Sequence, residues 1–288
     1  MPYADGIDAD CIQEAGEYMR HATFPFITPI SRVIEHDYGE VHGSATILSL
    51  CGRPYLLTCE HVAVQMEKSR LAHFTSNREA AAAVVNPFQC MAFPVDSAIS
   101  RIDDDMFQLM DKQALPAARI ATRFAPAEGE IIFVHGYPGE RGRFSALFGG
   151  IRAKTFPYAT DVTSLPPGFS ESSFFALSFP DDIWRFDGNI EIRPNPKGLS
   201  GSAVWNTKYV ASGTAGWEPD QSDIIGILHG YNEEYQCLVG VKIEIVRAFL
   251  LTALRHEAAY FRWRERNELT GNSLTDWLWA ETKITDVY

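Results

Sequence analysis

One serine of the chain has neighbours that suit a nucleophile. Ser200 lies in the segment Gly198-Leu199-Ser200-Gly201-Ser202, with glycines two residues before it and directly after it. Glycine lets the backbone turn tightly, which exposes the serine Oγ and lets main-chain N–H groups converge on a substrate carbonyl. A serine attacks a carbonyl when a nearby base removes its proton. The segment therefore predicts acyl-transfer chemistry if a histidine reaches it, and an ordinary glycine-rich turn otherwise.

His61 has the most informative surroundings of the eight histidines. It follows the run Tyr55-Leu56-Leu57-Thr58-Cys59-Glu60, which is typical of a buried strand that carries an imidazole at its end. We interpret Cys59 as a packed thiol rather than a nucleophile. The histidines that we interpret as surface or loop residues are His42, His73 and His135.

Several segments, in their order along the chain, resemble the trypsin-like (chymotrypsin-fold) serine proteases. In the first half they are Gly43-Ser44-Ala45-Thr46 and Leu56-Leu57-Thr58-Cys59-Glu60-His61-Val62, and in the second half Gly198-Leu199-Ser200-Gly201-Ser202. Residues 224–230 and 239–243 resemble strands that follow the nucleophile in that family. The resemblance covers about residues 39–250.

The pattern of apolar and turn-forming residues along the sequence agrees with the all-β fold that this resemblance implies. Short apolar segments broken by Gly and Pro recur at 130–137, 143–156, 172–179, 198–205, 208–213, 223–229 and 236–243. Helical periodicity is confined to 8–22, 243–267 and 273–282. We expect two six-stranded antiparallel β-barrels of the chymotrypsin type, with N-terminal and C-terminal helical extensions.

The same reasoning divides the chain into five segments. The expected boundaries are 1–38 for an N-terminal extension with a short helix, 39–115 for the first barrel, 116–127 for the linker, 128–246 for the second barrel and 247–288 for a C-terminal helical segment.

The resemblance implies a Ser-His-Asp triad, and its acid can be sought among the aspartates after His61. In the family this aspartate opens a segment of the form Asp-apolar-Ala-apolar. We expect Asp105 to be the acid, because its distances along the chain from His61 and Ser200 are close to those usual in the family. Asp104 and Asp96 are the alternatives. Asp96 opens Asp96-Ser97-Ala98-Ile99, whereas Asp105 has Phe107 in the place of the alanine.

The resemblance also implies an oxyanion hole and a substrate pocket. The main-chain N–H groups of Gly198 and Ser200 would form the hole. The residues expected to line the pocket are Arg193, Pro194, Asn195, Leu228, His229, Gly230 and Tyr231. We expect His229 to point away from the pocket and Leu228 into it, since neighbouring strand residues face opposite sides. A small or apolar residue would then precede the cleaved bond.

Composition limits the partners. The net charge of −12 makes nucleic acid a poor partner, and no apolar run is long enough to span a membrane. Five cysteines without a CxxC pair predict neither a disulfide framework nor a zinc site, and we expect no cofactor. With no secretory signal visible, the expected location is cytoplasmic. The expected partner is a protein or peptide substrate, and the unmatched ends leave room for a regulatory protein partner.

Two other functions fit parts of the sequence. In an α/β-hydrolase, residues 131–139 would form the oxyanion loop, Ser200 the nucleophile, and His229 or His256 the base. Ser202 stands where that fold wants glycine, and the segment after it does not predict a helix. The non-enzymatic alternative is a protease-like scaffold that binds peptides without cleaving them.

Overall fold

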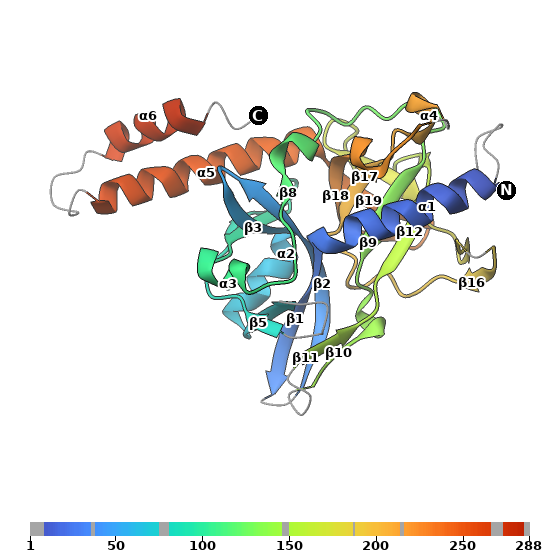
Figure 1. The fold of residues 1–288 in the computed structure, drawn as a ribbon, viewed down its shortest axis with the longest axis horizontal. Coiled ribbons are helices and arrows are strands. Elements are labelled where there is room, and N and C mark those ends of the chain that lie inside the picture. The colour runs from blue at the N-terminus through green and yellow to red at the C-terminus, as the bar shows by residue number, and fades with distance from the viewer. Residues whose placement is uncertain are drawn as a thin grey trace.

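The structure, a computed structural model, describes residues 9–35, 38–74, 81–145, 150–186, 188–213, 216–265 and 273–284. Most of the described chain forms two curled, almost entirely antiparallel sheets with helices at both ends (Figure 1). This is the all-β, two-barrel architecture with helical extensions that the sequence predicts, but the two described sheets have ten and seven strands rather than the expected six each.

The first sheet is organised around its longest strand, β2, which pairs with β1, β3, β8 and β10. Its main path runs β5-β4-β1-β2-β3-β7-β6, and β11 pairs with β10. β1 belongs to this sheet although it precedes residue 39, where we placed the start of the first barrel. The strands are β1 (Ile27–Glu35), β2 (Tyr38–Leu50), β3 (Arg53–Thr58), β4 (Leu71–Phe74), β5 (Ala81–Ala83), β6 (Gln89–Met91), β7 (Ser97–Arg101), β8 (Leu115–Pro116), β10 (Gly142–Ser145) and β11 (Gly150–Ala153).

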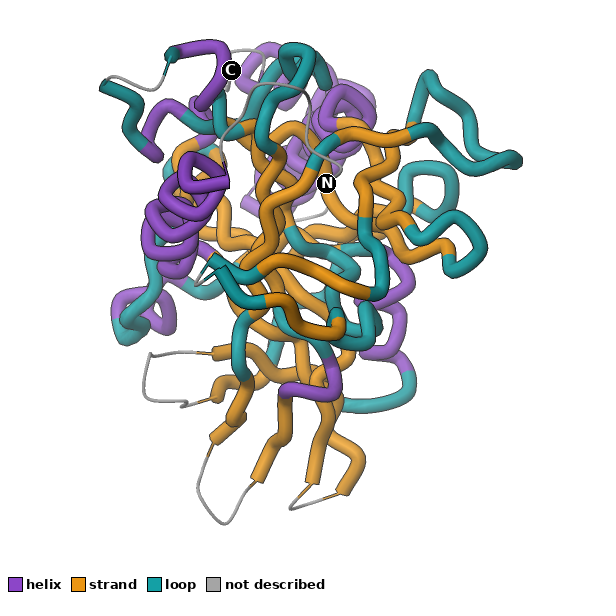
Figure 2. Tube along the Cα trace, turned by 90° about the vertical axis from the view of Figure 1, so that its right-hand side faces the viewer, coloured by secondary structure: helices purple, strands orange, loops and turns teal. Residues whose placement is uncertain are grey.

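The β10–β11 pair comes from the second half of the chain but belongs to the first sheet. It lies beyond the predicted linker, yet β10 pairs with β2, with Arg143 opposite Glu40. In Figures 1 and 2 the β1–β2 and β10–β11 pairs extend together past the rest of the molecule at the bottom of each view.

The second sheet runs β12-β9-β17-β18-β19-β14-β13. Its strands are β9 (Ile132–Gly136), β12 (Phe156–Thr160), β13 (Val162–Thr163), β14 (Phe174–Ser178), β17 (Ala203–Asn206), β18 (Asp223–Asn232) and β19 (Cys237–Lys242). A separate two-stranded sheet joins β15 (Asp182–Trp184) to β16 (Ile190–Ile192). Because β9 pairs antiparallel with both β12 and β17, residues 131–139 are not the oxyanion loop of a parallel α/β sheet. The α/β-hydrolase alternative is therefore wrong.

The prediction of a strand at 208–213 is also wrong, because this segment forms the short helix α4 (Tyr209–Ser212). The main-chain N–H groups of Val210 and Ala211 each donate to the buried carboxylate of Glu130, both at 3.1 Å. The carboxylate thus satisfies two donors that a strand would have directed to a neighbour.

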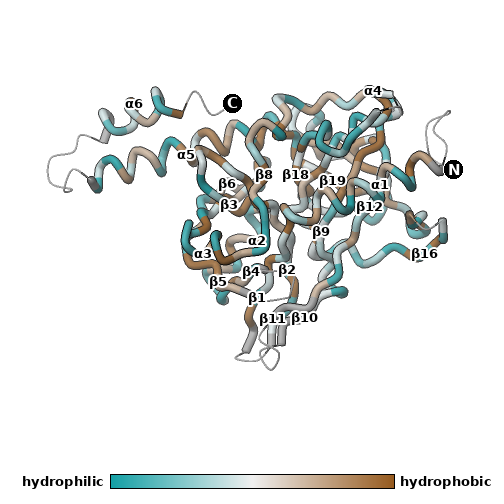
Figure 3. The backbone as a smooth tube through the Cα atoms, in the orientation of Figure 1, coloured by the Kyte–Doolittle hydropathy of each residue, from teal (hydrophilic) through white to brown (hydrophobic). Residues whose placement is uncertain are grey.

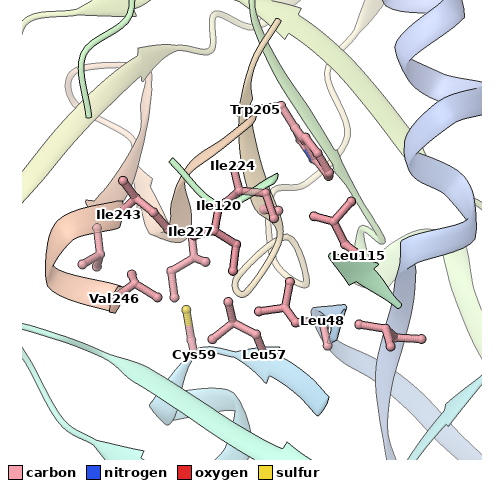
Figure 4. Close-up of a cluster of buried hydrophobic side chains, with 14 of the residues drawn as sticks. Leu48, Leu57, Cys59, Leu115, Ile120, Trp205, Ile224, Ile227, Ile243 and Val246 are labelled. Atoms are coloured by element: carbon pink, nitrogen blue, oxygen red, sulfur yellow. The ribbon is translucent and has the colours of Figure 1, made fainter. Parts of the chain in front are cut away.

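A continuous apolar core joins the two sheets (Figure 4). Leu48 and Leu57 come from the first sheet, Ile227 from β18, Ile120 from the connecting segment and Val246 from the C-terminal helix, and all five are buried. Burial of these side chains away from water stabilises one arrangement of the sheets. That arrangement matters because the candidate base and nucleophile come from different sheets.

The N-terminal and C-terminal segments form helices, and their bounds lie close to the predicted ranges. α1 (Ala9–Thr23) lies against β9 and β12, and α5 (Ile243–Glu265) begins where β19 ends and reaches β7 of the first sheet. α6 (Ser273–Ile284) packs on the C-terminal part of α5 (Figure 1). Polar and apolar residues alternate along α5 (Figure 3). None of the helices in the described residues is long and apolar enough to cross a bilayer.

Candidate active site

The imidazole of His61 contacts a buried carboxylate, that of Asp96. His61 lies in α2 (Glu60–Ala63), which follows β3 directly, and Asp96 immediately precedes β7. β3 and β7 pair with Thr58 opposite Ala98, so the residues beyond these strand ends meet. Nδ1 of His61 lies 2.9 Å from Oδ2 and 3.0 Å from Oδ1 of Asp96, and the main-chain N–H of His61 donates to Oδ1 at 3.1 Å.

The surroundings of Asp96 favour its ionised form. The residue is 2% exposed, and burial by itself would raise the pKa of its carboxyl. Hydrogen bonds from His229 and His61, with the charge of His61, outweigh burial and hold that pKa well below its usual range. Asp96 has a φ of +40°, a strained value for a residue other than glycine. A buried, ionised carboxylate held in a strained backbone is an arrangement that occurs at functional sites.

The structure does not bring Asp105 to His61, and the predicted pairing is corrected to Asp96. Asp105 is exposed on α3 (Asp104–Gln108), and Asp104 in the same helix pairs with Arg101 at 2.9 Å. The sequence did carry a signal for Asp96. Ala98 stands in the alanine place of the family's Asp-apolar-Ala-apolar segment, and Asp105 has Phe107 there.

Ser200 lies in a turn that requires its glycines. Gly198 and Gly201 have φ values of +98° and +87°. A Cβ on Gly201 would lie 2.2 Å from the carbonyl oxygen of Ser44 and 2.3 Å from Oγ1 of Thr58, so no other residue fits there without a shift. The glycine pattern seen in the sequence therefore reflects both backbone conformation and close approach to the first sheet.

Ser44 of β2 holds this turn from the first sheet. Its N–H donates to the carbonyl of Ser200 at 2.8 Å, and its Oγ donates to the carbonyl of Gly198 at 2.8 Å. Its Oγ also accepts a hydrogen bond from the N–H of Tyr137 at 2.8 Å. The Gly43-Ser44-Ala45-Thr46 segment thus connects the Ser200 turn to the sheet whose strand β3 precedes His61.

Two N–H groups of the turn have no acceptor among the described residues. Within the part of the chain that the structure describes, the N–H groups of Gly198 and Ser200 donate to no protein atom, whereas those of Lys197, Leu199 and Gly201 all do. Two uncommitted donors in one tight turn can stabilise a developing oxyanion.

The hydroxyl of Ser200 is directed elsewhere in this structure. Its Oγ donates to the main-chain carbonyl of His229 at 3.1 Å, and no hydrogen bond joins it to His61 among the described residues. Catalytic hydrogen bonds are often long or absent before a substrate binds, so this rotamer does not exclude the pair.

A pocket of about 640 Å³ opens beside Ser200. Of the residues expected to line it, Arg193, Asn195, Gly230 and Tyr231 do so. The other three do not: Pro194 and Leu228 are buried, and His229 turns toward Asp96. The lining residues that sequence reasoning missed are Asp181, Ile192, Pro196, Lys197 and Glu233.

The charge of Arg193 is already engaged within this pocket. Its Nη2 donates to the hydroxyl of Tyr231 at 2.7 Å and lies 3.0 Å from a carboxylate oxygen of Asp181. The guanidinium also lies 4.5 Å from the centre of the Tyr231 ring, within the range of a cation–π contact.

The buried thiol of Cys59 completes the surroundings of His61. Sγ of Cys59, a ring nitrogen of His61 and a carboxylate oxygen of Asp96 all lie within 4.8 Å of one another, a spacing that can hold a metal ion. Each atom already has a partner, however: the thiol donates to the carbonyl of Leu228 at 2.9 Å, and burial raises its pKa well above the usual range. We therefore treat the three as a hydrogen-bonded cluster and assign none of them as a metal ligand.

Two other histidines do not lie where we expected. The interpretation of His73 and His135 as surface or loop residues is wrong, because they are 2% and 0% exposed. Both stand in strands, β4 and β9, whose apolar neighbours carry them into the interior.

Comparison with known proteins gives structural neighbours. No protein-family model and no curated protein matches the sequence. The inactive form of Rv3671c from M. tuberculosis H37Rv is similar, with a TM-score of 0.47 and 14% identity over 88% of this chain and 96% of that one. The serine protease domain of the Sesbania mosaic virus polyprotein gives 0.45 and 13% over 78% and 92%. A Glu endopeptidase gives 0.44 and 13% over 79% and 91%. These neighbours include serine proteases of the chymotrypsin fold, and at 13–14% identity the likeness concerns the fold alone.

Proposed function

We propose that the protein is a serine endopeptidase that uses Ser200, His61 and Asp96. The observation that supports this most is the contact of the His61 imidazole with the buried carboxylate of Asp96, beside Thr58 at the end of β3, which lies against Gly201 of the Ser200 turn. The two uncommitted N–H groups of Gly198 and Ser200 add a site for negative charge.

The proposed mechanism assigns one task to each group. After rotation of its side chain, Ser200 attacks a peptide carbonyl while Nε2 of His61 takes the hydroxyl proton. Asp96 accepts a hydrogen bond from Nδ1–H, which fixes the tautomer and stabilises the imidazolium. The N–H groups of Gly198 and Ser200 hold the oxyanion, a contribution of about 3 kcal/mol for each donor. His61 then protonates the leaving amine, and water hydrolyses the acyl-enzyme.

The pocket supports an uncharged side chain before the cleaved bond. Its two cationic side chains, Arg193 and Lys197, are matched by two acids, Asp181 and Glu233, and Arg193 is already paired with Asp181. A charged substrate group would have to break this pair or stay unpaired. We therefore keep the expectation of a small or apolar residue at this position.

A fluorophosphonate probe and a peptide library test the proposal together. The probe should label the wild-type protein at Ser200, and the library should be cleaved after small or apolar residues. Ser200→Ala should abolish both signals without unfolding the chain. Ser212→Ala, which changes an exposed serine of α4, is the control and should leave both intact.

The two signals separate the competing functions. Absence of labelling in the folded wild-type protein would favour the peptide-binding scaffold and overturn the enzyme. If the probe labels Ser200 and the protein hydrolyses esters but cleaves no peptide, the activity is restricted to esters.

A further inference from the structure

His229 stands at an irregularity of the sheet that changes its direction. In the β18–β19 ladder Leu228 lies opposite Gly240 and Gly230 lies opposite Val239, so His229 has no partner residue. A bulge of this kind re-aims the side chain of its extra residue. Nδ1 of His229 consequently lies 2.6 Å from Oδ2 of Asp96.

The carboxylate of Asp96 therefore contacts two imidazoles, those of His61 and His229. An ionised carboxylate only accepts hydrogen bonds, so Nδ1 of His61 and Nδ1 of His229 must each bear a hydrogen. This assigns the same tautomer to both rings and leaves a lone pair on Nε2 of each. The rings meet edge to face, with their centres 5.9 Å apart.

The other neighbours of His229 carry no charge that would compete with this arrangement. Its ring lies about 6 Å from the rings of Phe93, Phe169 and Phe174, and its carbonyl accepts from Ser200. Among the described residues, its ring contacts two titratable groups, Asp96 and His61, and the thiol of Cys59 donates to the carbonyl of the adjacent Leu228. The electrostatic coupling is thus chiefly between two histidines through one carboxylate.

We propose that His229 is a positioning residue: neutral His229 holds Asp96 in place, and protonated His229 switches the site off. This inference rests on the proposed function. A neutral His229 orients Oδ2 without cancelling its charge. A protonated His229 would neutralise Asp96 and repel the imidazolium that must form on His61 during attack. Two protonations, one on each imidazole, would then lower the rate as the pH falls.

The rate of fluorophosphonate labelling at Ser200, measured from pH 5 to 8, tests this without a known substrate. For the wild type, the logarithm of the rate should fall at low pH with a slope approaching about 2, because two groups take up protons. His229→Asn keeps an N–H donor near the place of Nδ1 but cannot gain a proton, so its slope should be about 1. His229→Leu removes the donor and should label at least about tenfold more slowly at pH 8. The asparagine variant should recover most of that loss.

The outcomes distinguish this inference from the proposed function. A wild-type protein that is folded but never labelled overturns both. Labelling of the wild type and His229→Asn with the same slope of about 1 overturns the role of His229 alone. Thermal melting of each variant identifies a loss that arises from unfolding, and the asparagine variant provides the decisive slope if His229→Leu does not fold.

Discussion

At the scale of single residues, the sequence singled out the proposed nucleophile Ser200 and the proposed base His61, but not the carboxylate that contacts His61. Ser200 and His61 stand in local patterns, a glycine-bracketed turn and the end of an apolar strand, that can be read from their neighbours. The partner of His61 depends on the β3–β7 register, which places Thr58 opposite Ala98. Distance along the chain does not report that register. Spacing favoured Asp105, whereas strand pairing selects Asp96.

A pair of substitutions separates the two aspartates. Asp96→Asn should lower kcat/KM for a cleaved peptide by about 10³–10⁴-fold, because the amide neither fixes the productive tautomer of His61 nor stabilises its imidazolium. Asp105→Asn changes an exposed side chain of α3 and should leave kcat/KM within about twofold. Equal, large losses in both variants would contradict the assignment of Asp96.

At the scale of elements, strands were predictable where apolar residues and turn residues recur, and less so where one residue disturbs the ladder. Alternation along β18 predicted that Leu228 faces the pocket and His229 faces away. His229 does face away from the pocket and reaches Asp96 from the bulge, whereas Leu228 is buried and does not line the pocket. A bulge depends on pairing with β19 and leaves little trace in the sequence of β18 itself.

The turn that carries Ser200 gives a test at this scale. Gly201→Ala should destabilise the protein by about 2–5 kcal/mol and reduce labelling of Ser200, because the positive φ is strained and the new methyl group overlaps Ser44 and Thr58. Gly52→Ala is the matched control, since Gly52 also has a positive φ, +72°, but nothing within 4 Å of its Cβ position. It should cost about 1–2 kcal/mol and leave labelling unchanged. Chemical denaturation measures the free energy of unfolding of both variants. Equal destabilisation would show that the contact of Gly201 with the first sheet is unimportant.

At the scale of the whole molecule, the resemblance predicted two barrels but said nothing of how the N-terminal helix is attached to them. The end of α1 is fixed by Thr23, whose Oγ1 donates to the carbonyl of Met19 and lies 2.7 Å from Nδ1 of His135. Because the single hydroxyl hydrogen is used on Met19, Nδ1 of His135 must donate to Thr23. Nε2 of His135 is then a buried acceptor with no hydrogen-bond partner among the described residues.

This attachment predicts a specific sensitivity of folding to acid. Burial, with the charges of Lys112 and Arg20, lowers the pKa of His135 to about 3, whereas a histidine in an unfolded chain titrates near 6.5. Above about pH 6.5 both states are neutral at this residue and its contribution is constant. As the pH falls below that value the unfolded state gains the proton first, so stability is lost progressively toward pH 3. By pH 4.5 the loss from this residue should be on the order of 2–3 kcal/mol.

Denaturant unfolding at pH 7.0, 5.5 and 4.5 measures this contribution before most carboxyl groups take up protons. His135→Asn keeps a donor for Thr23 but does not titrate, so its free energy of unfolding should depend less on pH than that of the wild type, even if it is lower at pH 7.0. His21→Asn, at an exposed position of α1, should follow the wild-type dependence. If His135→Asn loses as much stability as the wild type between pH 7.0 and 4.5, His135 is not the group that ties folding to pH. The buried carboxylate of Asp96 cannot produce the same effect in this window, because its pKa is lowered rather than raised and its stabilising contribution persists below pH 4.5.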